Sequence, residues 1–408
     1  MSRIIILTEL YFPEQTSTGY LLTKTAEGLA KEYKVKVITG PATNFFLAEK
    51  SPPQETINNV DVIRCAGTTF NKDYFLGRIL NILTRTIAIF LKCLILCQRE
   101  DCLLVVTNPP LLPLVALLIK WLKNCLYVLL VHDVYPEALI ATQLVSSSSW
   151  LVKLLNIVNK IVYENSIKII SLGRDMNQLI ASKLSEKKIE KIALIPNWSD
   201  DEIEPTDRLN NSLLEKLNIG DRFIVIYSGN IGRTHGIEYL AQAAEKLINN
   251  QNIHFIVIGY GAKKDWLVEY KETKNLENIS LMSFLPRSEL ITSLNACDIA
   301  FIGFVPGMTG VSVPCRMYNQ MAAGKPIIAM TDDSSELAQV VQEENIGWVV
   351  APGNLDKLVE TIEFAASHPD ICKQMGDRAA VISKTKYNFD LTDQKYKQLF
   401  RDIFAQTT

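Results

Sequence analysis

The sequence RFIVIYSGNIGRTHGIEYLAQAAEKL, residues 222–247, contains a complete βα unit and decides the fold class. Residues 222–228 form a short apolar run, which is typical of a parallel strand buried on both faces. The loop GNIGRTHG follows, and the apolar residues after it share one face of a helix: Ile237, Leu240, Ala241, Ala244 and Leu247. A strand, a glycine-rich loop and a helix in this order predict an open parallel sheet.

The same pattern recurs in both directions along the chain. Downstream, strands are predicted at HFIVIG (254–259), ISLMSF (279–284), IAFIGF (299–304), KPIIAMT (325–331) and GWVV (347–350). Upstream, they are predicted at RIIILTE (3–9), VKVIT (35–39), CLLVVTN (102–108), CLYVLLVHD (125–133), IKIISLG (167–173) and KIALIPNW (191–198). A polar stretch, 199–221, separates the two series. We therefore predict an α/β protein with two Rossmann-like, doubly wound domains facing across a cleft: residues 1–200, residues 201–385, and a helix at 386–408 that packs back on the first domain.

The composition narrows the class of protein. The chain has 408 residues, is 48% apolar and carries a net charge of -2, which argues against general nucleic-acid binding. Its first half is basic and its second half is acidic. The 8 cysteines form no CxxC pair and there are 4 histidines, so we expect no metal site and a reducing, cytoplasmic environment. The N-terminal apolar run is too short for a signal peptide.

The segment 76–123 differs from the rest of the first half. Arg78, Arg85, Lys92 and Arg99 recur every seven residues in an otherwise apolar helix, which predicts one narrow basic stripe. LLPLVALLIKWLK (111–123) is apolar nearly all round. We favour peripheral contact of 76–123 with an anionic membrane surface. Two alternatives stay open, namely that both helices only cover the sheet, or that one of them spans a membrane.

Two loops of the first half follow predicted strands. EQTSTG (14–19), which ends at Gly19, predicts either an anion site at a helix N-terminus or an ordinary helix start capped by Ser17 or Thr18. VHDVYPE (131–137) places His132 and Asp133 at the end of a very apolar strand. His132 is a candidate hydrogen-bond partner of a substrate hydroxyl, and Asp133 a candidate for orienting an acceptor hydroxyl or taking its proton.

Two loops of the second half are rich in glycine. In YSGNIGRTHG (227–236) the glycines, including Gly229, allow close approach of a ligand, and Arg233 offers donors suited to phosphate oxygens. Gly259 and Gly261 in VIGYG (257–261) are either a wall for a nucleotide base or a tight βα turn. Neither loop has the spacing of a dinucleotide fingerprint or a P-loop.

GVSVPCRMYNQMAAGKPIIA (310–329) predicts a helix that starts near Pro314. The free amides of its first turn and the charge of Arg316 would favour an anion, and Asn319, one turn later, could reach a ribose hydroxyl. Without a ligand, Arg316 would form only a surface ion pair. The complete predicted donor-binding set is Gly19, Gly229, Asn230, Arg233, His235, Gly259, Gly261, Phe284, Leu285, Ser312, Val313, Arg316 and Asn319.

Six segments, taken in order, resemble glycosyltransferase family 4, and within it the WbuB-like bacterial group that builds lipopolysaccharide, capsule and exopolysaccharide. They are ELYFPEQTSTG (9–19), NPPLLPL (108–114), VHDVYPE (131–137), LIPNW (194–198), YSGNIGRTHGIEYL (227–240) and residues 310–329. The resemblance implies the GT-B fold and transfer of a sugar with retention of its anomeric configuration. It covers nearly the whole chain.

The chain departs from this family at two places. Many members carry two glutamates at the positions of Val311 and Asn319, and an Arg–Lys pair at the positions of Arg233 and His235. Loss of the first glutamate leaves the orientation of the donor sugar open. We expect Arg316 to restore the missing cation, so that Arg233 and Arg316 hold the diphosphate.

The resemblance implies a metal-independent hexosyl- or N-acetylhexosaminyl-transferase without a cofactor. Its donor would be a UDP- or GDP-linked sugar, and its acceptor a lipid-linked or polysaccharide-precursor saccharide at the inner face of the cytoplasmic membrane. Two other functions stay open: a sugar-nucleotide 2-epimerase of the same fold, and a noncatalytic partner of another transferase that binds nucleotide-sugar or membrane.

Overall fold

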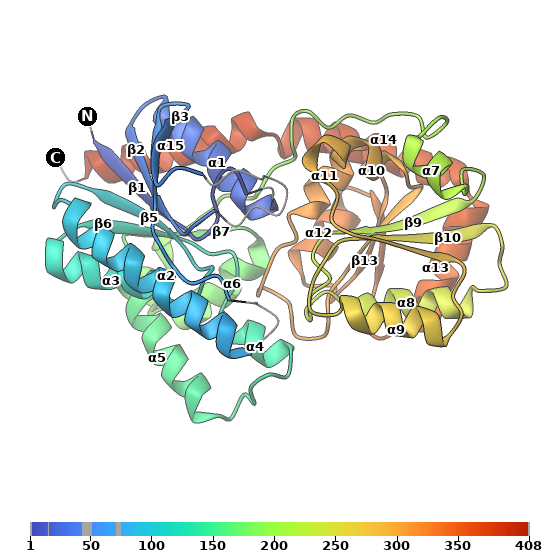
Figure 1. The fold of residues 1–408 in the computed structure, drawn as a ribbon, viewed down its shortest axis with the longest axis horizontal. Helices are drawn as coiled ribbons and strands as arrows, with labels where there is room; N and C mark the ends of the chain where they lie inside the picture. Colours follow the sequence, from blue (N-terminus) through green and yellow to red (C-terminus); the bar gives the residue numbers. More distant parts are fainter. Residues whose placement is uncertain (1, 15, 43–50, 71–74, 407–408) are drawn as a thin grey trace. The chain divides into compact units, whose positions relative to one another are not determined.

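The chain forms two compact units, each built around one sheet, which is mixed in the first unit and all parallel in the second (Figure 1). The computed structural model describes residues 2–14, 16–42, 51–70 and 75–406. The first unit comprises Met1–Pro136, Ser146–Pro196 and Asp390–Thr408, and the second comprises Glu137–Val145 and Asn197–Phe389. The division near residue 197 lies close to the predicted boundary, whereas residues 137–145 group with the second unit instead of the first.

The sheet of the first unit has eight strands in the order β3-β4-β2-β1-β5-β6-β7-β8. Ile4 to Leu7 of the central strand β1 are fully buried, as expected for a strand covered on both faces. The order reverses between β1 and β5, and open α/β sheets bind ligands at such a switch point. The strands are β1 (Arg3–Leu7), β2 (Lys34–Thr39), β3 (Gln54–Ile57), β4 (Val60–Arg64), β5 (Cys102–Val106), β6 (Leu126–Leu130), β7 (Lys168–Ser171) and β8 (Ile192–Leu194).

The helices of the first unit cover both faces of this sheet. Right-handed crossovers place α1 (Ser17–Ala30) on the face opposite α2 (Phe75–Leu96), α3 (Leu112–Lys123), α5 (Trp150–Asn165) and α6 (Arg174–Lys183). The short 3₁₀ helix η1 (Glu186–Lys191) leads into β8. The last helix, α15 (Phe389–Ala405), packs beside the end of α1, where Arg401 pairs with Glu32 at 2.6 Å and Tyr33 contacts Phe400 and Phe404. Residues 407–408 lie outside the described residues.

The second unit has a six-stranded sheet in the order β11-β10-β9-β12-β13-β14, and all of its strand pairs are parallel. Its switch point lies between β9 and β12, so the loops after these two strands are where a ligand is expected. The strands are β9 (Phe223–Ser228), β10 (Ile253–Ile258), β11 (Ile279–Met282), β12 (Ile299–Gly303), β13 (Ile327–Met330) and β14 (Gly347–Val350).

The helices of the second unit complete the doubly wound pattern that the sequence predicts. All five apolar residues predicted on the inner face of α8 are buried in one cluster with β9 and β10 residues. The helices are α4 (Glu137–Ala141), α7 (Ser212–Leu217), α8 (Ile237–Lys246), α9 (Lys264–Thr273), η2 (Arg287–Glu289), α10 (Leu290–Asn295), α11 (Arg316–Ala322), α12 (Glu336–Glu343), α13 (Leu355–Ser367) and α14 (Pro369–Lys386). The predicted α/β class with two Rossmann-like domains is therefore confirmed.

Candidate functional site

The two glycine loops of the second unit lie directly against each other at the ends of β9 and β10. The amide of Gly229 donates to the carbonyl of Ile258 at 2.9 Å, and that of Ile231 to Tyr260 at 2.9 Å. A Cβ on Gly259 would lie 1.9 Å from the Gly229 carbonyl oxygen, and φ is +152° at Gly259 and +157° at Gly261. The contact between the two backbones therefore requires both glycines. This favours the tight-turn interpretation of VIGYG, and contact with a base stays a prediction.

Arg316, at the start of α11, lies beside the first of these loops. Its guanidinium carbon is 4.6 Å from the centre of the Tyr227 ring, and a Cβ on Gly229 would be 3.2 Å from its Nη1. Nη2 is buried and has no hydrogen-bond partner among the residues that the structure describes. A buried donor without a partner is costly, which makes this atom a candidate for binding an oxygen supplied from outside the chain.

His235 shares these surroundings. Its Nδ1 is buried without a partner among the described residues, and its ring lies 5.8 Å from that of Phe304. Burial, together with the charge of Arg316, lowers the pKa of His235 well below its ordinary value, so the imidazole is neutral. His235 therefore cannot replace the charge of the lysine that the resemblance leads one to expect at this position.

Arg233 stands apart from this cluster. It is exposed, and its guanidinium has no hydrogen bond or ion pair with any part of the chain that the structure describes. The loop geometry thus brings Gly229, Tyr227 and Arg316 together, places His235 within the influence of the Arg316 charge, and leaves Arg233 free to reorient. Its role as a diphosphate contact stays a prediction.

The first turn of α11 differs from the prediction. The helix begins at Arg316 instead of near Pro314, after a turn in which the amides of Met317 and Tyr318 donate to the carbonyls of Pro314 and Cys315 at 3.1 and 3.2 Å. The prediction that these first-turn amides are free was therefore wrong for two of them. The side chain of Arg316 is the stronger candidate for contact with an anion.

The side chain of Asn319 is already used in a hydrogen bond within the protein. Its Oδ1 accepts a hydrogen bond from the amide of Asp200 at 3.1 Å, and the carboxylate of Asp200 pairs with Arg287. This bond ties α11 to the segment that leads into the second unit. A ribose contact would therefore have to use the amide nitrogen of Asn319, and it stays a prediction.

The other predicted donor-binding residues differ in exposure. Val313 is buried, at 5%, so at this position only the backbone could meet a ligand, and the same holds at 1% for Val311, where many family members carry a glutamate. Ser312 is half-buried. Leu285 packs against the core cluster under β9 and β10, whereas Phe284 is 39% exposed just after β11. Asn230 is exposed, and its carbonyl accepts a hydrogen bond from the Tyr227 hydroxyl.

The first unit presents His132 and Asp133 after β6. The hydroxyl of Thr107, just after β5, accepts hydrogen bonds from the amides of His132 and Asp133 at 3.1 and 3.2 Å and donates to the Asp133 carbonyl at 3.0 Å. Nε2 of His132 is buried with no hydrogen-bond partner among the described residues. Burial lowers the pKa of His132 to about 4, so its imidazole is neutral and can exchange a hydrogen bond with a ligand.

Gly19 is buried in the first turn of α1. Its amide donates to Oγ1 of Thr16 at 3.3 Å, so Thr16 caps the helix and the predicted caps, Ser17 and Thr18, were wrong. A Cβ on Gly19 would lie 3.0 Å from the Glu14 carbonyl oxygen, which gives this glycine a packing role. Gln15 of the predicted loop lies outside the described residues.

Sequence reasoning missed Thr107 and Tyr227. Thr107 is the polar residue that follows the apolar run of β5, and Tyr227 is the one aromatic residue near the end of β9, so a search for such residues at strand ends would have found both. Within the described ranges, no group of three or more His, Cys, Asp or Glu residues could hold a metal ion.

Residues 211–381 match the family model described as Glycosyl transferases group 1. The probable glycosyltransferase WbjE of Pseudomonas aeruginosa is 27% identical over 412 residues, which is all of both chains. The putative colanic acid biosynthesis glycosyl transferase WcaI of Escherichia coli is 24% identical over 214 residues, 50% of this chain and 52% of its own.

Two solved structures resemble the whole chain. Sucrose-phosphate synthase from Thermosynechococcus elongatus matches 99% of this chain and 100% of its own, with a TM-score of 0.80 and 17% identity. HepE from Anabaena, solved with UDP and glucose, matches 98% of this chain and 100% of its own, with a TM-score of 0.75 and 14% identity. These likenesses confirm the GT-B fold that the sequence predicts.

Proposed function

We propose that the chain transfers a sugar, with retention of its anomeric configuration, from a nucleotide-diphosphate sugar to an acceptor in cell-surface polysaccharide synthesis. One observation carries the proposal: Arg316 places a buried guanidinium nitrogen without a partner beside the glycine loop at the switch point of a group 1 glycosyltransferase domain, as far as the structure describes the chain. The names of WbjE and WcaI support this reaction class, and neither an epimerase nor a noncatalytic partner gains support from them.

The donor we propose is a UDP-linked hexose or N-acetylhexosamine, with a GDP-linked sugar as the alternative. HepE, which shares the fold, was solved with UDP and glucose. In this chain the diphosphate would contact Arg316 and Arg233, since these guanidinium groups have the forked donors that suit phosphate oxygens. Phe284, exposed just after β11, is a candidate contact for the base.

The proposed chemistry follows from where charge develops. The bond between the sugar carbon and the diphosphate breaks, and the diphosphate leaves with the electron pair. The acceptor oxygen bonds to the same face of the sugar carbon, and its proton passes to the departing phosphate. Arg316 and Arg233 would stabilise the charge on the leaving group. Neutral His132 would bind a sugar hydroxyl, and Asp133 would orient the acceptor.

We further propose that transfer needs no metal ion, that the acceptor is a lipid-linked saccharide, and that the protein works at the cytoplasmic face of a membrane, which it meets through residues 76–123. The arginines would then take the part that a metal ion plays at other diphosphates. If no metal ion is needed, the rate of sugar transfer is unchanged in excess EDTA. A rate that falls in EDTA and recovers when Mg²⁺ is added would contradict metal independence.

A binding titration tests the donor site directly. We expect UDP-glucose or UDP-N-acetylglucosamine to raise the melting temperature of the wild-type protein and of Lys373→Ala, which removes one exposed cation of the same unit. At 100 times its dissociation constant a ligand adds ~2.7 kcal/mol to the free energy of unfolding. Arg316→Ala should melt normally without ligand and lose most of this shift. An unchanged shift in Arg316→Ala would show that the diphosphate binds elsewhere.

A further inference from the structure

Helix α2 buries its polar residues Asn81 and Arg85 and exposes an apolar stripe. The buried positions recur every four residues at Asn81, Arg85, Ile89 and Cys93, and continue at Cys97 just after the helix. Arg85, predicted to be part of an exposed basic stripe, is 1% exposed, so that prediction was wrong; Lys92 and Arg99 are exposed, and the side chain of Arg78 lies outside what the structure describes.

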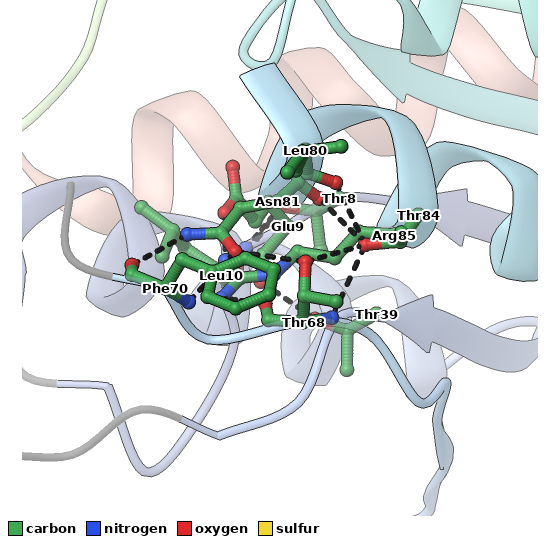
Figure 2. Close-up of polar contacts among 10 residues, drawn as sticks. All are labelled: Thr8, Glu9, Leu10, Thr39, Thr68, Phe70, Leu80, Asn81, Thr84 and Arg85. Atoms are coloured by element: carbon green, nitrogen blue, oxygen red, sulfur yellow. Dashed lines mark hydrogen bonds and ion pairs between the residues drawn. The ribbon is translucent and has the colours of Figure 1, made fainter. Parts of the chain in front are cut away.

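The buried polar residues are fully engaged (Figure 2). Arg85 pairs with Glu9 and donates to the Thr68 carbonyl at 3.1 and 3.3 Å. Asn81 accepts from the Thr68 hydroxyl and the Phe70 amide, each at 2.9 Å, and donates to the Phe70 carbonyl at 2.8 Å. These bonds fix which face of α2 points inward. The helix is therefore held with its apolar side facing outward.

The apolar side of α2 continues over two further helices. Helices α2, α3 and α5 pack next to one another, as Figure 1 shows for the blue, teal and green helices of the first unit. Their exposed apolar residues, which together we name the apolar plate, are Leu76, Leu80, Leu83, Ile87, Leu91 and Ile95 on α2, Leu118, Trp121 and Leu122 on α3, and Trp150, Leu154, Ile157 and Ile161 on α5. Most monomeric proteins expose no continuous apolar patch of this kind without a partner.

The charges around the apolar plate are mostly positive. The sequences of α2 and α3 contain no Asp or Glu, and the one acid of α5, Glu164, pairs with Lys188. Lys92, Lys153 and Lys160 are exposed on α2 and α5. The exposed carboxylates nearest in sequence to these helices are Glu100, which follows α2, and Glu186 and Glu190 of η1.

A second group of lysines surrounds the C-terminal end of α5. Lys120, Lys188 and Lys191 donate to the carbonyls of Asn165, Glu164 and Ser166 at 2.6 to 3.2 Å. Burial, and then repulsion by Lys188, lowers the pKa of Lys120 and of Lys191, as expected where cations crowd together. Such a concentration of positive charge beside an apolar surface suits anionic phospholipid headgroups.

We propose that the apolar plate inserts into the headgroup layer of an anionic phospholipid membrane. This deepens the proposed contact of residues 76–123 by adding α5 and by reversing the face of α2 that meets the lipid. Trp121, in the last turn of α3, and Trp150, the first residue of α5, are exposed and would sit at the interface, where tryptophan is favoured. The binding needs neither donor nor sugar transfer, so its test is independent of the proposed reaction.

The geometry favours lying on the membrane over crossing it. Residues 79–96 are the one helical stretch among the described residues that is long and apolar enough to span, and 22% of it is buried. Spanning would pull Arg85 away from Glu9 and Asn81 away from Thr68, and would put these polar groups into hydrocarbon. A second copy of the chain suits the plate less well, because a two-fold contact would bring its lysines near their own copies.

Flotation with lipid vesicles tests the proposal. We expect the wild-type protein to bind vesicles of phosphatidylcholine and phosphatidylglycerol in equal parts far better than pure phosphatidylcholine. The double variant Leu91→Ser and Ile157→Ser should lower the partition coefficient about tenfold or more. The matched control, Leu209→Ser and Val381→Ser, changes two exposed apolar residues of the second unit and should bind like wild type. Equal binding of both variants overturns the proposal.

Two further measurements, sedimentation and fluorescence quenching, distinguish insertion into the headgroup layer from dimerisation and from deeper insertion. If the wild-type protein fails to float, forms dimers in sedimentation experiments, and becomes monomeric only in the plate variant, the plate joins two copies and the membrane proposal is overturned. Lipids brominated near the headgroup should quench the fluorescence of Trp121 and Trp150 more than lipids brominated at the tail end, and Trp121→Phe with Trp150→Phe should abolish the difference. Stronger quenching from the tail end would mean that these tryptophans lie deep in the hydrocarbon, and would overturn insertion at the headgroup layer.

Discussion

Arg316 is a cation that the fold leaves partly unsatisfied. Its guanidinium stacks on Tyr227 and contacts Gly229, while Nη2 is buried without a partner among the described residues. A cation on an aromatic face gains ~1–2 kcal/mol, which is less than a strong charge-assisted hydrogen bond would add. The residue is thus held in place by a neighbour that leaves its hydrogen-bonding capacity available to an anion.

Gly229→Ala should disturb the position of the Arg316 guanidinium without replacing Arg316 itself. The new Cβ would lie 3.2 Å from Nη1, and φ at this position is +146°, which side chains rarely adopt. We expect a loss of ~1–2 kcal/mol in the free energy of unfolding and a larger loss in donor affinity. Urea denaturation and calorimetric titration with UDP-glucose measure the two effects. Gly353→Ala, at a site with φ +84° and open space, controls for backbone strain alone, and equal donor affinities in the two variants would argue against contact through Arg316.

Three of the 4 histidines are held neutral by the fold. Burial lowers the pKa of His132 and His254 to about 4, and that of His235 well below its ordinary value of about 6.5. Between pH 6.5 and 4 the unfolded chain therefore binds protons that the folded chain does not, so stability present above pH 6.5 is lost as the pH falls.

His254→Gln tests this pH dependence at a site away from the proposed reaction. The wild-type protein should lose ~2 kcal/mol per buried histidine in the free energy of unfolding between pH 7 and pH 5, and the variant should lose correspondingly less. Urea denaturation at both pH values gives the slopes. A variant as steep as wild type would show that His254 is protonated in the folded protein.

At the scale of elements, periodicity showed which residues share a face but not which face is buried. In α2 the stripe that contains Arg85 was predicted to be exposed, yet Glu9 and the Thr68 carbonyl hold it inside. These partners come from other segments of the chain, so the sequence of the helix does not reveal them. In a helix with apolar residues on most sides, the few polar contacts thus decide which face is buried.

Arg85→Ala should cost ~3 kcal/mol or more in the free energy of unfolding, because it leaves Glu9 without its partner next to the buried end of β1. Lys92→Ala, one heptad later and exposed, should cost close to nothing. Chemical denaturation of both variants makes the comparison. Equal stabilities would mean that α2 does not depend on this ion pair.

The sequence predicted the strands that are buried on both faces, because a short continuous apolar run such as that of β1 is typical of a strand covered by helices on either side. It missed the hairpin of β3 and β4, whose edge strand β3 is polar and whose strand β4 is short, although Asn58 and Asn59, both with positive φ, mark its turn. The loops of the candidate site could be predicted from the sequence, because each comes directly after a predicted strand. The hydrogen bond from the Asp200 amide to Asn319 could not be predicted in this way, since it joins residues 119 positions apart.

At the scale of the whole molecule, the chain returns at its end to the unit in which it began. Phe400 of α15 is fully buried and contacts Tyr33, and Leu399 and Ile403 are buried beside it. The last helix is therefore a structural part of the first unit, and the second unit has its own sheet and core cluster. If the second unit binds the donor through its own residues, as we propose, damage to α15 should leave donor binding intact.

Phe400→Ala should accordingly destabilise the protein by ~3–5 kcal/mol while the folded protein binds UDP-glucose as wild type does. Val381→Ala, at an exposed position of α14, should change neither property. Thermal unfolding and a titration at low temperature separate stability from binding. A loss of donor affinity that matches the loss of stability would contradict donor binding by the second unit alone.

The central claim is that the guanidinium of Arg316, in the region that matches the group 1 glycosyltransferase model, stabilises the diphosphate as it leaves the sugar. The most direct measurement is the rate at which labelled sugar from a saturating nucleotide-sugar enters a bacterial lipid extract, for wild type, Arg316→Ala and Lys373→Ala. We predict that Arg316→Ala lowers this rate by a factor of about 10² to 10³, the usual effect of losing one donor to developing charge, and that Lys373→Ala leaves it unchanged. Equal rates for wild type and Arg316→Ala would contradict the claim.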